Sequence, residues 1–441
     1  MRLIISIALF FTNSLLFAQE GKLYTIKQNG KHFKSIEFDV KKNTLYTNII
    51  PDFEASSLNI EISNNHNFEK AYFILGNDEK RMLNLDNEQT QIVQESAARI
   101  NSQSSALIIS NSSFKNFSFY TANIEGRIRI NLLYASPLKS SYLKDKKKRT
   151  DSIDCSIAPE SIDQEIWRTG LPDPAGNPTP TTVKHIILHH AAGNNTDTQY
   201  LATVRNYYML HTQTNGWDDI GYNYLVAPNG DIYNGRDGFQ YGDDNVIGAH
   251  LCARNANTMG ICLLGNYHNT GYLPSDTAIA SINKLIVWKM HKERLSNPYD
   301  SSLHPINNPE WYLGVVAGHR EGCPTGYTSC PGEQYFQQIN DRVKANVAIA
   351  LSNCIPLSSS TLKFNEALIY PNPLNARYLN VVFYEKIHSI KVYNTQGKLL
   401  KNIENIEGYR YELENEYTQE GLILLEINGQ HRYKIIVNER Y

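Results

Sequence analysis

The chain has no excess of charge of one sign: 42 lysine and arginine residues stand against 44 aspartate and glutamate residues, for a formal net charge of −2. Proteins that bind nucleic acids usually carry a basic excess, so we expect no nucleic-acid partner. Long apolar runs are missing after the N-terminal segment, and we therefore expect no transmembrane segment once that segment is removed. These absences leave a soluble, folded protein as the expectation.

The N-terminal segment 1–18 has the features of a secretory signal peptide. MRLIISIALFFTNSLLFA places Arg2 before an apolar run and ends on the small residue Ala18. A membrane anchor is the alternative, but the run is short and is interrupted by TNS. We therefore expect cleavage and a secreted or cell-surface, extracytoplasmic protein.

Cysteine is scarce, with 6 residues in the whole chain. An exported protein can form disulfides, so these thiols could pair with one another. If one of them binds a metal, five remain, and an odd number leaves at least one thiol outside any disulfide within the chain. Cysteine pairing therefore bears on any metal site that contains a thiolate.

At 441 residues the chain is too long for a single hydrophobic core, and its patterns divide it into several domains. Segment 19–138 consists of short alternating strands between polar clusters, which predicts an all-β accessory domain, a sandwich or a barrel. Segment 139–165 contains KDKKKR and predicts an exposed linker. A second linker at 355–365 precedes a compact β-sandwich at 366–441.

Segment 166–354 predicts an α/β domain, a mixed β-sheet flanked by helices, between the two all-β domains. VKHIILH and MGICLLG predict buried strands, and VVAGH predicts a shorter one. Apolar periodicity predicts helices over 196–214, with Thr196 as N-cap, over 277–295 and over 332–351. Asn229-Gly230 predicts the turn of a hairpin. Cys155 and Cys354 flank this domain, and a disulfide between them would join its ends.

Two histidines and a cysteine follow strands of this domain. His189 lies at the end of VKHIILH, His319 at the end of VVAGH, and Cys330 in the loop TSCPG. Side chains at neighbouring strand ends can meet at one edge of a sheet. Two imidazoles and a thiolate would hold zinc and leave a fourth position for water. Each residue alone is more often structural, a hydrogen-bonded histidine or a disulfide cysteine, so the spacing does not decide the matter.

Four separated blocks occur in a fixed order: IILHHAAG, WDDIGYNYLVAPNGDIYNGRD, IGAH with MGICLLGNY, and GHRE with TSCPG. Together these blocks resemble the zinc N-acetylmuramoyl-L-alanine amidases, which include the peptidoglycan recognition proteins and phage amidases. The likeness implies a secreted Zn²⁺ amidase that cuts the bond between N-acetylmuramoyl and L-alanine in peptidoglycan, by attack of zinc-bound hydroxide. It implies His189, His319 and Cys330 as the metal ligands.

The resemblance also implies two catalytic residues. In this family a Tyr in the G-Y block and a Thr or Lys two residues before the ligand Cys assist catalysis, and here these are Tyr222 and Thr328. Their hydroxyls could donate to the oxyanion of the reaction. Relatives without the ligand Cys are typically inactive receptors. The alternatives are a recognition protein that binds peptidoglycan without turnover, and an adhesin in which the N-terminal β domain is the active part.

Other polar residues of these blocks have less defined roles. His190 should face the opposite side of the sheet from His189 and take a structural role. His250 and Trp217 could line a substrate cleft or pack internally. Arg320 could contact a substrate carboxylate, although a structural donor is the expected role.

One departure from the family lies between His319 and Cys330, where this chain is a few residues longer. The additional segment contains Cys323, for which there are several interpretations. Cys323 could pair with another cysteine such as Cys252, could replace Cys330 as ligand, or could pair with Cys330 and destroy the site. The context Thr-x-Cys-Pro-Gly favours Cys330 as the ligand.

The C-terminal segment carries IYPNP, VYNTQGKLLKN and a closing strand. These blocks resemble the sorting domain of type IX secretion substrates. The resemblance implies recognition by outer-membrane secretion machinery, with release or retention at the cell surface. A generic β-sandwich or a sugar-binding module is the alternative.

Overall fold

The structure is a computed structural model. It describes residues 15–17, 24–63, 70–76, 79–83, 102–138, 155, 157–236, 246–268, 271–303, 312–354, 367–370, 374, 378–414, 416 and 421–437. The predicted linker at 355–365, the KDKKKR run and most of the predicted signal peptide lie outside these residues. Among the helices described, none combines the length and apolarity needed to cross a membrane.

The N-terminal part is all-β, as predicted, and its strands form two sheets around one core. The first sheet has the order β1-β4-β10-β6-β7, with bounds Leu15–Phe17, Leu45–Ile49, Phe117–Tyr120, Tyr72–Leu75 and Glu79–Met82. The second has the order β2-β3-β11-β5-β8, with β9 beside β5, and bounds Thr25–Asn29, Phe33–Val40, Gly126–Leu133, Ala55–Ser63, Ser102–Ser104 and, for β9, Ile108–Phe114. Alternating side chains such as Ile36, Ile60 and Phe73 are fully buried between the sheets.

The central part contains the predicted mixed sheet, in the order β14-β13-β15-β12-β18. The bounds of these strands are Ile232–Asn234, Tyr224–Val226, Thr258–Leu263, His185–His190 and Val316–Gly318. β12 runs parallel to both of its neighbours, while β13 and β14 form the predicted antiparallel hairpin. Every residue of β12 and β15 is buried, which explains why both sequences are continuous apolar runs. β16 (Ser301–Leu303) and β17 (Tyr312–Gly314) form a separate antiparallel pair, which precedes β18 in the chain.

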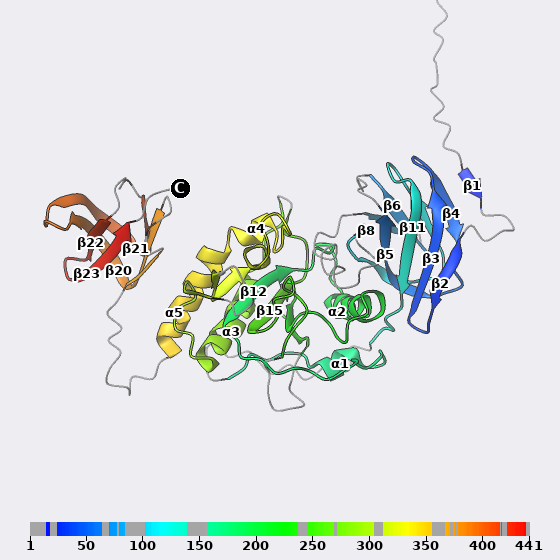
Figure 1. Ribbon diagram of the computed structural model, residues 1–441, viewed down its shortest axis with the longest axis horizontal. Helices are drawn as coiled ribbons and strands as arrows, with labels where there is room; N and C mark the ends of the chain where they lie inside the picture. The colour runs from blue at the N-terminus through cyan, green and yellow to red at the C-terminus, as the bar shows by residue number, and fades with distance from the viewer. Residues whose placement is uncertain are drawn as a thin grey trace, which may run out of the picture.

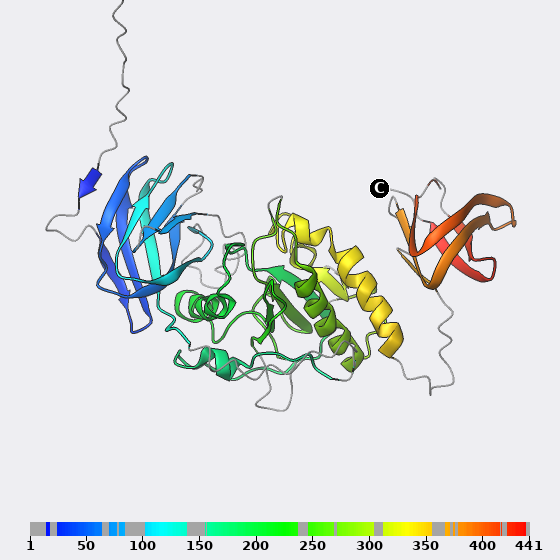
Figure 2. The ribbon, with the colours of Figure 1, turned by 180° about the vertical axis from the view of Figure 1, so that it is seen from behind.

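Helices cover both faces of this sheet (Figure 1). On one face α3 (Asp276–Lys292) and α5 (Ala345–Cys354) pack with η6 (Ile339–Lys344) against alternate residues of β12 and β15, and Figure 2 shows α3 and α5 side by side. On the other face lies α2 (Tyr200–Met209), which continues as η3 (Leu210–Thr214). Short helices α1 (Gln164–Arg168), η5 (His319–Gly322) and α4 (Glu333–Phe336) complete this part. The face that carries α2 also carries the side chain of His189.

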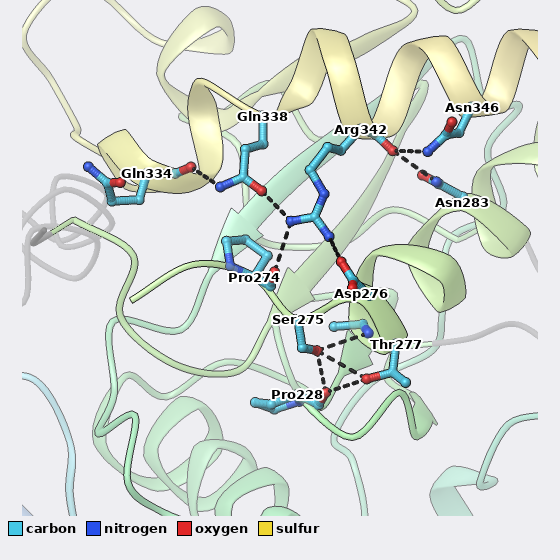
Figure 3. A network of polar contacts seen from close by, with 11 residues as sticks. Pro228, Pro274, Ser275, Asp276, Thr277, Asn283, Gln334, Gln338, Arg342 and Asn346 are labelled. Atoms are coloured by element: carbon cyan, nitrogen blue, oxygen red, sulfur yellow. Dashed lines mark hydrogen bonds and ion pairs between the residues drawn. The ribbon is translucent and has the colours of Figure 1, made fainter. Parts of the chain in front are cut away.

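A polar network joins the beginning of α3 to the helices that close the domain (Figure 3). The Ser275 hydroxyl caps α3 by accepting from the Ala278 N–H at 3.1 Å. The Arg342 guanidinium pairs with Asp276 and donates to the Pro274 carbonyl at 3.0 Å. The Arg342 carbonyl accepts from the Asn283 side chain at 3.0 Å. These bonds fix the helical layer that supports β12 from behind.

Two local expectations are wrong. Thr196 does not cap α2: the helix begins at Tyr200 after Gln199, which has no capping side-chain bond. Instead Asn194 Oδ1 accepts from the Thr196 N–H at 3.1 Å, and this local turn replaces a helical start. The helix predicted over 332–351 is divided into α4, η6 and α5, with a wider turn in the middle.

The N-terminal strands pack directly against α2. Phe33 and Leu133 belong to the same buried cluster as Val204 and Tyr208 of α2. Oδ1 of Asn206, which is 1% exposed, accepts from the Ser57 hydroxyl at 2.6 Å. The interface therefore combines apolar burial with a satisfied buried amide.

The C-terminal part is built of strands, as predicted. Its sheet contains β19 (Leu368–Tyr370), β20 (Tyr378–Asn394), β21 (Leu399–Glu414), β22 (Gly421–Ile427) and β23 (His431–Val437). The register of β20 against β21 shifts between Val382 and Ile387, and the buried side chains of these strands form a core of their own.

Candidate metal centre

His189 is placed by the central strand of the mixed sheet. Its register partner on β15 is Cys262, and its side chain is fully buried. Because neighbours on a strand point to opposite faces, His190 lies on the other side, where its Nδ1 accepts from the Tyr267 N–H at 3.1 Å. The structural role predicted for His190 is confirmed.

His319 and Cys330 come from the segment that follows the neighbouring strand β18. β18 ends at Gly318, and His319 opens η5. The loop between His319 and Cys330 brings Cys330 back beside η5, where the Arg320 N–H donates to the Cys330 carbonyl at 2.9 Å. The donor atoms of His189, His319 and Cys330 all lie within 4.8 Å of one another, and the three residues are buried.

Burial keeps His189 and its neighbour His250 neutral. Desolvation lowers the pKa of His189 well below its usual range, and the neighbouring His319 and His250 lower it further. Desolvation also lowers the pKa of His250 to about 3, again with a contribution from His319. Each of these two rings therefore carries one proton and one nitrogen lone pair at neutral pH.

A chain of hydrogen bonds determines which nitrogen of His189 keeps the lone pair. The Asn255 carbonyl can only accept, so the Thr258 hydroxyl donates to it at 2.7 Å. That hydroxyl oxygen lies 3.3 Å from Nε2 of His250 and accepts its proton. Nδ1 of His250 then accepts from Nε2 of His189 at 3.0 Å. The lone pair of His189 is left on Nδ1, which lies 3.7 Å from Sγ of Cys330.

The three donors fit zinc by their chemistry and their spacing. Two imidazoles and a thiolate are a ligand set found in catalytic zinc sites. With Zn–S bonds of about 2.3 Å and Zn–N bonds of about 2.0 Å, two ligand atoms of a tetrahedral site lie roughly 3.5 Å apart. The 3.7 Å between Cys330 Sγ and His189 Nδ1 agrees with this separation.

The loop around Cys330 is held by backbone and side-chain bonds. The His190 N–H points at Sγ of Cys330, with the nitrogen 3.4 Å away, which favours a negatively charged sulfur. The Cys330 N–H donates to the Thr328 hydroxyl at 3.0 Å, and this bond fixes Thr328 beside the ligand. The role of Thr328 in catalysis stays a prediction.

Arg320 is half-buried and contacts the same loop. Its guanidinium pairs with Glu333 at 2.7 Å, donates to the Ser329 carbonyl and lies 4.4 Å from the centre of the Phe336 ring. These contacts are those of a structural donor, the expected role. A substrate contact by Arg320 stays a prediction.

Aromatic rings connect His189 to the side of α2. The ring centres of His189 and Tyr222 lie 5.2 Å apart, those of Tyr222 and His211 5.7 Å, and those of His211 and Trp217 4.6 Å. Tyr222 is buried and Trp217 is half-buried. The structure thus brings Tyr222 to the metal centre, whereas the rings of Tyr222 and His211 lie between Trp217 and His189.

The cysteine pairing leaves Cys330 outside any disulfide. Cys252 and Cys323 are joined, so Cys323 neither replaces Cys330 nor pairs with it. Cys155 and Cys354 form the expected link between the ends of the central domain. Cys262 is the other cysteine that is not in a disulfide.

Sequence reasoning missed the hydrogen bond from His189 to His250 and its continuation to Thr258 and Asn255. His250 is 3% exposed, and its Nδ1 is hydrogen-bonded to the candidate ligand His189. The segment HLCARNANT held the signal, because Asn255 Oδ1 accepts from the N–H of His250 at 2.7 Å and so orients the turn. A contact between His250 and substrate stays a prediction.

The fold and the buried His-His-Cys cluster define a class of α/β proteins with a candidate zinc site at one edge of a mixed sheet. Residues 179–333 match the family model for N-acetylmuramoyl-L-alanine amidase, and residues 368–438 match that for a secretion system C-terminal sorting domain. Peptidoglycan-recognition protein SC2 of Drosophila melanogaster is 31% identical over 159 residues, which cover 36% of this chain and 72% of the relative.

Two further relatives extend the comparison. The N-acetylmuramoyl-L-alanine amidase of Sus scrofa is 29% identical over 148 residues, which cover 34% of this chain and only 21% of that protein. The solved structure of Drosophila PGRP-LB is 25% identical and covers 41% of this chain and 93% of its own, with a TM-score of 0.32. The chain belongs to the family of N-acetylmuramoyl-L-alanine amidases and peptidoglycan-recognition proteins, and it carries a C-terminal sorting domain of type IX secretion.

Proposed function

We propose that the central domain is a zinc amidase that hydrolyses the bond between N-acetylmuramoyl and L-alanine in bacterial peptidoglycan. The observation that carries the proposal is the convergence of His189, His319 and Cys330 in a chain of this family. A bound Zn²⁺ would lower the pKa of water, so that it can act as a nucleophile near neutral pH, and would polarise the amide carbonyl. The proposed substrate, peptidoglycan, is inferred from the matching amidase family.

Hydrogen bonds from neighbouring residues orient His189 and favour the thiolate form of Cys330. The bond from His189 to His250 directs the Nδ1 lone pair of His189 toward Cys330. The N–H of His190 supports a thiolate at Cys330. Such outer contacts orient the ligand atoms of a zinc site.

Tyr222 and Thr328 are proposed to stabilise the charge that develops on the amide oxygen. Tyr222 lies against the His189 ring, and Thr328 is two residues before Cys330 in the loop that this cysteine anchors. A hydroxyl that donates to an oxyanion is worth more in a buried site than in water. Their presence favours turnover over binding alone.

A second candidate function is peptidoglycan recognition without turnover, because the Drosophila relative is named a peptidoglycan-recognition protein. In either case we propose that the predicted signal peptide at 1–18 is removed together with the edge strand β1 that it contains, and that outer-membrane secretion machinery reads the C-terminal domain. The enzyme would then meet its polymeric substrate outside the cytoplasm, secreted or at the cell surface.

Zinc content and wall hydrolysis of two cysteine variants test the proposal. Cys330→Ala should lose zinc and hydrolysis together. Cys262→Ala is the matched control, because Cys262 is also buried, also outside any disulfide and beside His189 in register. It should keep both properties. Zinc and activity retained in Cys330→Ala would contradict the ligand assignment, while zinc bound without hydrolysis in the wild type would favour recognition alone.

A further inference from the structure

The Cys252–Cys323 disulfide lies directly beside a candidate ligand of the metal centre. Cys252 is in the turn before β15, and Cys323 directly follows η5, which His319 opens. Sγ of Cys252 lies 3.8 Å from Nε2 of His319. Leu251 and Cys323 share a small buried cluster with Ala317 of β18, so the disulfide is part of the packing behind His319.

These residues also form a second set of possible metal ligands. The donor atoms of Cys252, His319 and Cys323 lie within 4.8 Å of one another. The distance of 3.8 Å between Cys252 Sγ and His319 Nε2 is near the roughly 3.5 Å expected for two ligands of one tetrahedral zinc. Two thiolates and an imidazole are soft donors of the kind that bind zinc, but the sulfur–sulfur bond prevents both sulfurs from acting as thiolates.

We propose that Cys252, His319 and Cys323 form a second, redox-controlled metal site that is closed by the disulfide and opened by reduction. The ligand is a divalent transition metal that accepts thiolates, such as Zn²⁺. Cys252 is half-buried, so a small reductant can approach the disulfide from the Cys252 side, while Cys323 and His319 are each 4% exposed. The site is thus accessible at one ligand and enclosed at the other two.

The opening step balances with a dithiol as reductant. The dithiol gives two electrons and two protons and becomes a disulfide, the bond between the two Sγ atoms breaks, and each sulfur becomes a thiol. The incoming metal ion then displaces both thiol protons to solvent, and two thiolates bind it. The Cα atoms of Cys252 and Cys323 lie 5.8 Å apart, so the two sulfurs can separate around an ion without a large backbone movement.

The two ligand sets share His319. A neutral imidazole gives its single lone pair to one metal ion, so the sets compete for this ring. Reduction should therefore draw the ion away from His189 and Cys330 and lower hydrolysis. This competition rests on the proposed function, whereas the existence of the second site does not.

Cobalt binding by Cys330→Ser tests the second site without the first thiolate. Co²⁺ accepts the tetrahedral sites of zinc, and each thiolate that binds it adds intense charge-transfer absorption. The disulfide is reduced with a trialkylphosphine, which takes the oxygen of water as its oxide while the two protons go to sulfur, and the phosphine is removed before Co²⁺ is added. We expect no thiolate band before reduction and, after it, a band roughly twice as intense as that of oxidised wild type, since two thiolates replace one.

The control is the triple variant Cys330→Ser/Cys252→Ser/Cys323→Ser, which keeps Cys155, Cys262 and Cys354. Its reduced form should show no thiolate band. Absence of the band in reduced Cys330→Ser, or an equal band in the triple variant, overturns the proposal. The band does not depend on hydrolysis, so a failed amidase assay leaves this result interpretable.

The wild type gives a second measurement if Cys330→Ser does not fold. Reduction should increase the cobalt band of the wild type and leave that of Cys252→Ser/Cys323→Ser unchanged. An equal response of both proteins overturns the second site. Metal counting then tests the competition: one ion per reduced chain is expected, and two ions per chain contradict the shared use of His319.

Discussion

Nε2 of His189 lies 3.0 Å from Nδ1 of His250, and both rings are buried. The bond joins a strand end to a loop 61 residues further along the chain. It fixes the tautomer of a candidate ligand through a residue that is not itself in the ligand set. Such outer contacts commonly orient the histidines of zinc sites.

Replacing His250 should weaken metal binding while the fold persists. His250→Ala removes the acceptor for His189 Nε2, so zinc affinity should fall roughly 10- to 100-fold. His250→Asn restores an acceptor near the position of Nδ1 and should recover part of the affinity. Zinc titration measures both, with His291→Ala on α3 as the control histidine. Equal zinc affinity in all three variants would show that His250 does not position His189.

Tyr222 should affect the rate more than substrate binding. Tyr222→Phe keeps the ring against His189 but removes the hydroxyl, so kcat should fall by about 10²- to 10³-fold with little change in KM. Tyr208→Phe is the matched control, because it removes a buried tyrosine hydroxyl whose partner is the Pro172 carbonyl at 2.7 Å. Steady-state kinetics on soluble muropeptides separates the two. A normal kcat in Tyr222→Phe would remove the hydroxyl from the mechanism.

Asp219 should make the stability depend on pH. Burial raises the pKa of this carboxyl from 3.8 to about 6, although Gln164 and Arg236 oppose the shift. Because the folded-state pKa is the higher one, the stability linked to Asp219 is fully present below about pH 4 and is lost as the pH rises through about 6. The loss should be on the order of 2 to 3 kcal/mol.

Asp219→Asn provides the comparison, since an amide oxygen can still accept from Gln164 and from the Ile220 N–H. The variant should gain free energy of unfolding relative to the wild type between about pH 4 and pH 7. Denaturant unfolding at several pH values measures this difference. A difference that stays constant over that range would show that Asp219 titrates normally in the fold.

Much of the central sheet could be predicted because its sequence is locally consistent. β12 and β15 are buried on both faces, and so their sequences are continuous apolar runs. α3 has both the apolar spacing and a capping serine, Ser275. His189 and His319 were predictable as neighbours because His189 lies at the carboxyl end of β12, His319 directly follows β18, and these two strands pair in parallel.

The contacts that sequence reasoning missed depend on distant segments or on competing local bonds. Thr196 has a good capping side chain, but its hydroxyl donates to Asn194 Oδ1, and the N–H of Gln199, which a capping Thr196 would accept, donates to Asp197 Oδ1. The helix therefore starts later, at Tyr200. The partner of Cys323 could not be chosen from several cysteines until the loop after η5 was placed beside the turn at Cys252. The bond between His189 and His250 likewise follows from tertiary packing, which no local pattern encodes.

Release of L-alanine amino ends from purified peptidoglycan tests the central claim most directly. The measurement compares zinc-loaded wild type with Cys330→Ala that has been treated with zinc in the same way, and binding to the same wall preparation is followed in parallel. The proposed amidase predicts new alanine amino ends with the wild type and none above background with the variant. Wild type that carries zinc and binds the wall, yet releases no alanine amino ends, would contradict the account.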